Sequence, residues 1–200
     1  YAREYDAAIS PNGNIPVHAF NLISPTFFAN SSTGNKYSLW VNVYGVSERY
    51  LNVYGEKDLR AQMNQFFHRT YTHPVDGTTL DMKMLCNWYW YDETAILETG
   101  KGTKDWNFYR YAETLLSAAE AIAQSSGVNA EAAGYLAQVK ARANMEGKDV
   151  STIASELQRL GKQAFIEECW KERLREFPLE MKIWDDCVRT GKFPQISATK

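Results

Sequence analysis

A change of hydrophobic period near Asp105 constrains the fold of this chain more than any other feature. From Asp105 to Gly191 the apolar residues recur every three or four positions, the spacing of one face of an α-helix. Before Asp105 the chain is rich in Asn, Gly, Thr and aromatic residues, with short extended runs between turn signals. We therefore expect a mainly α protein with a loop-rich, aromatic region with a few short strands over residues 1–104 and a helical region over residues 105–200.

The first two helices of the helical region have clear boundary signals. The first is expected between Asp105, an N-cap residue type, and Gly127, which suits a left-handed C-terminal position. Asn129 is expected to cap a second helix that ends before Asn144. Because the connection is short, the two helices should form an antiparallel hairpin. The apolar face of the first helix comprises Phe108, Ala112, Leu115, Leu116, Ala119, Ile122 and Ala123.

A third helical stretch is expected to begin after Ser151 or Thr152 and to run to about Phe177, with Gly161 as a weak point or kink. Pro178 should end this stretch because proline lacks the backbone N–H that a helix needs.

Further elements are expected on either side of these helices. A last short helix should run from Leu179 to Arg189 and stop at Gly191. In the first region, apolar residues at helical spacing predict one helix around Glu56 to Phe67, and Asp76–Gly77 is a turn signal.

The composition excludes several classes of partner. The 200 residues are 44% hydrophobic, enough for a sizeable core, and the formal net charge is -2 with dispersed Lys and Arg. We therefore expect no nucleic-acid partner. No apolar run approaches the roughly 20 residues of a membrane span. Cys86, Cys169 and Cys187 have no metal-site spacing and are expected to be buried thiols, although two of them would pair if the fold brought them together.

Two ordered motifs in the helical region carry a family resemblance. Residues 110–121 read RYAETLLSAAEA, and downstream follow Glu172-Arg173, Glu176-Phe177 and the segment WDDCVRTGKFP from Trp184 to Pro194. Together they resemble the C-terminal part of the SusD/RagB family. The sequence departs from that pattern at Met181, where the family usually has Gly.

The resemblance implies a helical scaffold related to tetratricopeptide repeats and a non-catalytic protein of the outer cell surface. Members capture glycans or other nutrients and deliver them to a SusC-like TonB-dependent transporter. The resemblance also implies that an N-terminal region with more helical repeats is missing. Since the sequence opens on Tyr1, we expect the signal and the lipidated cysteine, the only attachment to the membrane, to be absent from it as well.

The charged residues of the helical region favour a structural role over catalysis. Glu113 and Glu120 lie two turns apart on one helix and are expected to pair with basic groups such as Arg142 or Arg173. Asp186 and Arg189 are expected to form another ion pair. The charge run Glu167, Glu168, Lys171, Glu172, Arg173 and Arg175 is expected to form a solvated helix face.

No pattern in the sequence indicates an enzyme. No pair of carboxylates stands out for glycoside hydrolysis, and no nucleophile motif or phosphate loop is present. His68 and His73, in an expected loop, have no third ligand to complete a metal site. We therefore predict no catalytic residues, no metal and no cofactor.

The run Asn87-Trp88-Tyr89-Trp90-Tyr91-Asp92 is the best candidate for ligand contact. On an extended chain Trp88 and Trp90 would project to one side, and Tyr89 and Tyr91 to the other. Flat aromatic rings can stack on the apolar C–H faces of sugars, while Asn87 and Asp92 supply hydrogen-bonding groups. We predict that Trp88, Trp90, Tyr89, Asn87 and Asp92, with Trp40 as a second platform, bind the ligand.

Two alternatives stay open at this point. All four aromatic side chains of the run could instead pack a strand on both sides, as core residues. The whole chain could also be a helical-repeat adapter that recognises another protein and has no site for a small ligand. Exposure of Trp40, Trp88 and Trp90 would distinguish a ligand platform from a core.

Overall fold

A computed structural model describes residues 2–4, 46–74, 77–89, 91–93, 104–178 and 180–193. These residues belong to two compact units, each treated separately below. The hairpin unit comprises residues 1–50 and 61–108, and the helical unit comprises residues 51–60 and 109–200.

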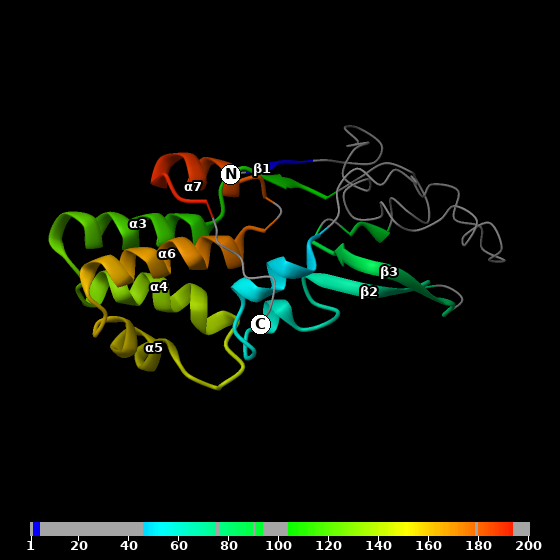
Figure 1. The fold of residues 1–200 in the computed structure, drawn as a ribbon, viewed down its shortest axis with the longest axis horizontal. Helices are drawn as coiled ribbons and strands as arrows, with labels where there is room; N and C mark the ends of the chain where they lie inside the picture. The colour runs from blue at the N-terminus through cyan, green and yellow to red at the C-terminus, as the bar shows by residue number, and fades with distance from the viewer. Residues whose placement is uncertain are drawn as a thin grey trace. The chain divides into compact units, whose positions relative to one another are not determined.

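Among the described residues of the helical unit there are five α-helices: α3 (Tyr111–Ser126), α4 (Ala130–Arg142), α5 (Val150–Leu157), α6 (Lys162–Glu176) and α7 (Ile183–Thr190). Figure 1 shows α3, α4 and α6 side by side, with α5 against α4 and α7 beside α3 and α6. The segment 51–60 carries the end of the 3₁₀ turn η1 (Glu48–Val53) and the start of η2 (Leu59–Ala61). The predicted mainly α fold and the α3–α4 hairpin are confirmed.

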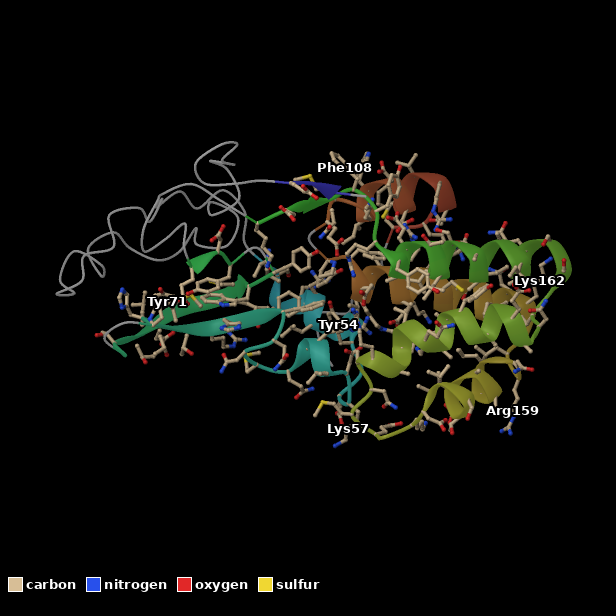
Figure 2. All side chains as sticks on the ribbon, turned by 180° about the vertical axis from the view of Figure 1, so that it is seen from behind. Tyr54, Lys57, Tyr71, Phe108, Arg159 and Lys162 are labelled. Carbon is tan, nitrogen blue, oxygen red and sulfur yellow. The ribbon has the colours of Figure 1, made fainter. Side chains whose placement is uncertain are left out.

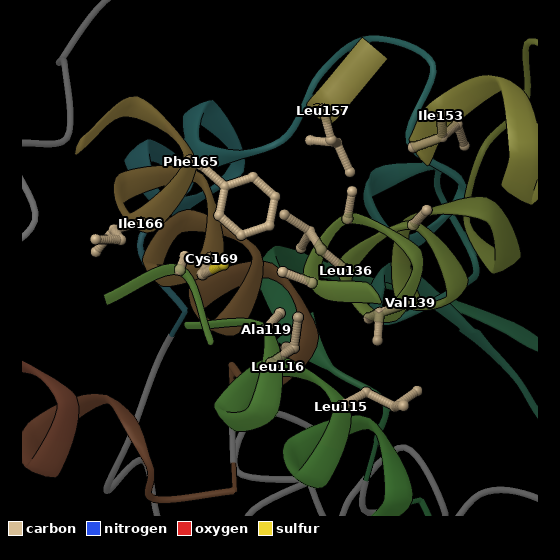
Figure 3. Packing of buried hydrophobic residues seen from close by; sticks show 14 of the residues in the cluster. Leu115, Leu116, Ala119, Leu136, Val139, Ile153, Leu157, Phe165, Ile166 and Cys169 are labelled. Carbon is tan, nitrogen blue, oxygen red and sulfur yellow. The ribbon is translucent and has the colours of Figure 1, made fainter. Parts of the chain in front are cut away.

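The core of the helical unit contains the residues that the helical period places on one face. Figure 3 shows Leu116 and Ala119 of α3, Leu136 of α4, and Phe165 and Cys169 of α6 packed together. All five are 0% exposed. Ile153 and Leu157 of α5 belong to the same cluster, so one core joins the four helices α3 to α6. Burying each large apolar side chain stabilises the fold by about 1.5–3 kcal/mol.

The helix boundaries confirm some capping signals and correct others. The Asn129 side chain accepts a hydrogen bond from Ala132 N at 2.9 Å, and Gly127 ends α3 with a φ of 85°. The predicted N-cap Asp105 is wrong, because Trp106–Asn107 (β4) pairs with Ala2–Arg3 (β1) and α3 begins only after Arg110. Strand pairing, which local sequence does not reveal, replaces the first helical turn.

The expected stretch from residue 151 to Phe177 is two helices rather than one. Asp149, not Ser151 or Thr152, caps α5 by accepting a hydrogen bond from Thr152 N at 2.7 Å. The chain then turns after Leu157, and Gly161 becomes the N-cap of α6. The weak point at Gly161 is therefore a true break in the helix.

The last helix is shorter than expected. The helix α7 begins at Ile183, because Met181 adopts a left-handed φ of 58° that is incompatible with a helix. The helix ends, as predicted, at Gly191, which has a φ of 66°.

In the described part of the hairpin unit the longest strands form an antiparallel pair, β2 (Phe67–Thr72) and β3 (Thr79–Asn87). The register places His68 opposite Cys86 and Tyr71 opposite Leu80, with an irregularity between His68 and Thr70. At the connecting turn Gly77 has a φ of 73°, as its turn signal predicts.

The helix predicted around Glu56 to Phe67 is wrong. The 3₁₀ turn η2 occupies only Leu59–Ala61, and Phe67 already begins β2. Phe67 is fully buried and pairs with Asn87 across the hairpin, and this pairing overrides the weak helical period of a short segment.

Buried ion pairs correct the expected role of the α6 charge run. Glu172 and Arg173 are 1% and 6% exposed, so this run is not a solvated face. Arg173 pairs with Glu113 at 3.3 Å, as predicted, and with Asp186 at 2.7 Å. Arg189 pairs with Asp186 at 2.8 Å and with Glu120 at 2.7 Å.

Candidate ligand-binding site

The predicted aromatic run lies where β3 ends, and it turns rather than continuing as a strand. Trp88 N donates a last hydrogen bond to Phe66 O at 2.8 Å. Tyr91 N then donates to Trp88 O at 3.1 Å, which closes a turn. The Asn87 side chain accepts from Tyr89 N at 2.7 Å, a local bond that favours turning over extension. The expected alternation of the side chains along an extended chain is therefore wrong.

The turn brings four rings of the hairpin unit together: His68, Tyr71, Trp88 and Tyr91, here called the aromatic cluster. The Trp88 ring is stacked on His68 with centroids 4.0 Å apart and on Tyr91 with centroids 5.0 Å apart. Figure 2 shows Tyr71 on the hairpin. Its ring centroid lies 5.8 Å from that of Trp88 and 6.3 Å from that of Tyr91. Tyr71 is buried, whereas the other three rings are half-buried and partly open to solvent.

Burial favours the neutral forms of His68 and Tyr91 in the aromatic cluster. Burial lowers the pKa of His68 below its ordinary value. Two backbone hydrogen bonds favour the charged form, but their effect is smaller than that of burial. Burial raises the pKa of Tyr91, whose hydroxyl donates to Glu93 Oε2 at 3.1 Å. His68 and Tyr91 are therefore uncharged rings of the cluster at neutral pH.

The polar groups beside the aromatic cluster are mostly engaged by the backbone. Asp92, 7% exposed, accepts a hydrogen bond from Lys104 N at 3.2 Å. The Lys104 ammonium donates to Tyr89 O and lies 5.2 Å from the centroid of the Tyr89 ring. Burial lowers the pKa of Lys104. These contacts tie the segment around Lys104 to the aromatic turn.

One buried amide at this turn is incompletely satisfied. Asn87 is 5% exposed, and while its Oδ1 accepts from Tyr89 N, its Nδ2 donates to no acceptor among the described residues. A buried donor without a partner costs about 1–3 kcal/mol, which a hydroxyl or carbonyl oxygen would offset. Asn87 Nδ2 is therefore a buried donor beside the aromatic cluster.

The structure brings together some of the predicted site residues and adds others. Asn87, Trp88, Tyr89 and Asp92 share one turn, while Trp40 and Trp90 lie outside the described residues. The contributions of His68 and Tyr71 were not predicted, since they depend on the β2–β3 register. Lys104 could not be predicted either, because it is remote in sequence from the turn that it contacts.

The other candidate groups of the sequence behave as structural residues. All three cysteines are free and buried, and burial raises the pKa of Cys86 to about 12. His68 lies in β2 rather than in a loop. Within the described ranges no three His, Cys, Asp or Glu side chains cluster as metal ligands would, and no helix is long and apolar enough to cross a membrane.

Comparison with known proteins supplies the family. The model of the SusD family matches residues 29–197, most of the chain. No curated protein matches the sequence.

Three solved structures share the fold. A SusD superfamily protein from Parabacteroides distasonis matches all of this chain at 22% identity with a TM-score of 0.78, over 41% of its own length. A SusD superfamily protein from Bacteroides fragilis matches 93% of this chain at 18% identity with a TM-score of 0.59, over 39% of its length. Surface glycan-binding protein A from Bacteroides uniformis matches 90% of this chain at 22% identity with a TM-score of 0.57, over 36% of its length.

These likenesses confirm the predicted SusD-like scaffold. The chain spans about two fifths of the length of each solved relative.

Proposed function

This chain belongs to the SusD family, and from that premise we propose that it binds a glycan or related nutrient at the outer cell surface. The match of the family model to residues 29–197 is the observation that carries the proposal. The structural relative from Bacteroides uniformis is itself a surface glycan-binding protein, which supports glycan as the ligand class. In this proposal the ligand is captured unchanged and handed to a SusC-like TonB-dependent transporter, and the chain catalyses no reaction.

We place the ligand contact at the aromatic turn of the hairpin unit. The half-buried ring of Tyr89 and the rings stacked around Trp88 would contact sugar rings, and Asn87 remains a predicted hydrogen-bonding partner of the ligand. Asp92 would hold the turn through Lys104 N and contact the ligand only at its edge. Trp40 and Trp90 remain predicted members of the same site.

Calorimetric titration of the chain with a panel of neutral and acidic oligosaccharides would test this placement. Trp88→Ala should weaken binding by about tenfold, the equivalent of about 1.4 kcal/mol of lost stacking. Trp184→Ala is a matched control, since it removes an exposed Trp from the helical unit. Equal affinities of the two folded variants would exclude Trp88 from the site. Failure of every oligosaccharide to bind would count against glycan capture.

One observation favours the alternative of a protein–protein adapter. Three apolar side chains at or beside α7 are 62–67% exposed: Met181, Trp184 and Val188. The ring centroid of Trp184 lies 6.0 Å from that of the exposed Phe193. Exposed apolar groups of this kind are common in protein interfaces. If Trp184→Ala abolishes a specific partnership while no oligosaccharide binds, the adapter function is correct. Co-purification with a TonB-dependent transporter together with oligosaccharide binding supports the proposed function instead.

A further inference from the structure

Two arginines of the helical unit flank the stretch 61–108, which belongs to the hairpin unit. The chain leaves the helical unit after Arg60 and returns to it at Tyr109, and Arg110 is the next residue. Arg60 is buried and Arg110 is half-buried, so both flanking arginines need acidic partners.

One carboxylate, that of Glu176, pairs with both flanking arginines. Glu176 Oε2 accepts a hydrogen bond from Arg60 Nη1 at 2.9 Å, and Glu176 Oε1 accepts one from Arg110 Nη1 at 3.0 Å. The Glu176 side chain is fully buried. Figure 1 shows that α6, whose last residue is Glu176, ends beside the start of α3, where Arg110 is the N-cap. The two ends of the stretch 61–108 are therefore held at one point.

Each flanking arginine is fixed in its orientation by a second carboxylate. Asp58 accepts hydrogen bonds from Arg60 Nε at 2.9 Å and from Arg60 Nη2 at 2.7 Å. Glu180 accepts from Arg110 Nε at 2.8 Å and from Arg110 Nη2 at 2.6 Å. Two parallel hydrogen bonds to one carboxylate fix the plane of a guanidinium group. In both arginines this leaves the third nitrogen, Nη1, directed at Glu176.

The residues that meet at Glu176 include members of both sequence motifs of the helical region. Arg110 opens the motif at residues 110–121, and Glu176 belongs to the downstream motif. Both residues lie outside the hairpin unit, so contact with a ligand at the aromatic turn does not account for them. Their pairing brings the two motifs together at the ends of the stretch 61–108.

Holding both ends of a chain segment at one point stabilises the segment between them. When the ends are fixed, the unfolded form of the segment has fewer conformations, as in a loop closed by a disulfide. The folded form loses no comparable freedom, because its ends already lie at that point. The stretch 61–108 contains β2 and β3, so these strands gain stability from ion pairs made within the helical unit.

We propose that Glu176, Arg60 and Arg110 form a junction that closes the stretch 61–108 and thereby keeps β2 and β3 folded. The junction acts as a noncovalent counterpart of a disulfide. Loss of either arginine contact lets these strands open more often than the core of the helical unit. This device goes beyond the proposed function, because it operates whether or not the aromatic turn binds a glycan.

Hydrogen–deuterium exchange of the whole chain, followed by mass spectrometry, measures the opening of each unit separately. In Glu176→Gln, the acceleration of exchange should be at least fivefold greater in β2 and β3 than at the centre of α4. Gln keeps the shape of Glu but lacks its charge. Arg60 keeps Asp58 and Arg110 keeps Glu180 as partners, so the helical unit should still fold.

Glu120→Gln is the matched control. Glu120 is another buried carboxylate of the helical unit, but it pairs with Arg189 at 2.7 Å. Any acceleration of exchange in this variant should be no greater in β2 and β3 than in α4.

Arg110→Lys is a second test, which leaves the buried carboxylate in place. A lysine ammonium cannot bind Glu176 and Glu180 in the fixed fork of a guanidinium group. The same preferential opening of β2 and β3 is therefore expected. The double variant Glu176→Gln/Arg110→Lys should exchange within twofold of the faster single variant, because both changes break the same link.

Three results would overturn the proposal. The first is equal acceleration of exchange in α4 and in β2 and β3 when Glu176 or Arg110 is substituted; if Glu176→Gln does not fold, Arg110→Lys alone decides this point. The second is that Glu120→Gln opens β2 and β3 as selectively as Glu176→Gln. The third is that the effects of the two single substitutions multiply in the double variant, which would mean that they break separate links.

Discussion

The helical unit and the hairpin unit bury similar residue types but are stabilised differently. In the helical unit, fifteen buried hydrophobic residues form one continuous cluster, and charged side chains of α6 pair with neighbouring segments. In the hairpin unit, the described core centres on two strands and the aromatic cluster that packs at their end. A large shared core tolerates buried charge, whereas the described part of the hairpin unit is held together by strand pairing and specific ring contacts.

A Phe→Ala substitution in the core of each unit should give the largest effects on stability and tests this difference directly. Phe165 and Phe67 are both 0% exposed. We expect Phe165→Ala to lower the free energy of unfolding by about 4 kcal/mol, and Phe67→Ala by about 3 kcal/mol, because the end of a two-stranded pair relaxes around a cavity more readily than the centre of a helical cluster. Urea unfolding followed by circular dichroism would measure both. A greater loss for Phe67→Ala would reverse the comparison.

Removal of the buried carboxylate of Glu176 should cause the next largest loss of stability. It pairs with Arg60 at 2.9 Å, with Arg110 at 3.0 Å and with Arg142, and is itself 1% exposed. We expect Glu176→Ala to cost about 3 kcal/mol, since buried Arg60 loses a partner, while Arg142 is exposed enough to regain water. The isosteric Glu176→Gln is the control and should cost less. No loss of stability in Glu176→Ala would mean that this cluster does not hold the unit together.

Each unit also contains a described non-glycine residue with a left-handed backbone conformation. Substitution of these two residues by Gly should change the free energy of unfolding by different amounts. Met181 has a φ of 58° and Asn64 a φ of 64°. Because Asn tolerates this conformation and Met does not, Met181→Gly should raise the free energy of unfolding by about 1 kcal/mol, and Asn64→Gly by less. Met181 is 65% exposed, so little packing is lost. Thermal unfolding of both variants would measure the two gains in stability. A larger gain in stability for Asn64→Gly than for Met181→Gly would contradict this explanation.

The smallest expected effect is the pH dependence that His68 contributes in the hairpin unit. Burial lowers the folded pKa of His68 below its ordinary value of 6.5, so the unfolded chain takes up a proton first as the pH falls. This contribution to stability is present above pH 6.5 and is lost as the pH falls toward the folded pKa. An NMR titration should give His68 a midpoint below 6.5 that rises in Trp88→Ala, where the stacked ring is gone. An unchanged midpoint would show that Trp88 does not contribute to the burial of His68.

Local signals predicted the parts of the fold in which a residue acts on its immediate neighbours. Asn129 caps α4 through a residue three positions away, and Gly127 and Gly191 adopt left-handed conformations at helix ends. The residues Leu116 and Ala119 are fully buried, as their helical spacing predicts. The same reasoning failed at Asp105, where strand β1 pairs with the following residues.

At the candidate site, the residue types were predicted but their arrangement was not. Asn87, Trp88, Tyr89 and Asp92 were chosen because aromatic rings and amides suit sugars, and they lie together in one turn. The stacking of Trp88 on His68 joins residues twenty positions apart and depends on strand register. Propensity and period carry no information about such a contact.

The sequence by itself determined the helical scaffold and the family, because the hydrophobic period and the capping residues act within a few positions along the chain. Only the tertiary structure decided that the charges of Glu172 and Arg173 are buried and that the aromatic run turns at Trp88. It alone also decided that Arg60 and Arg110 pair with one carboxylate, that of Glu176. The physical reason is that burial and pairing depend on which segments meet in space, and distances along the chain do not specify this.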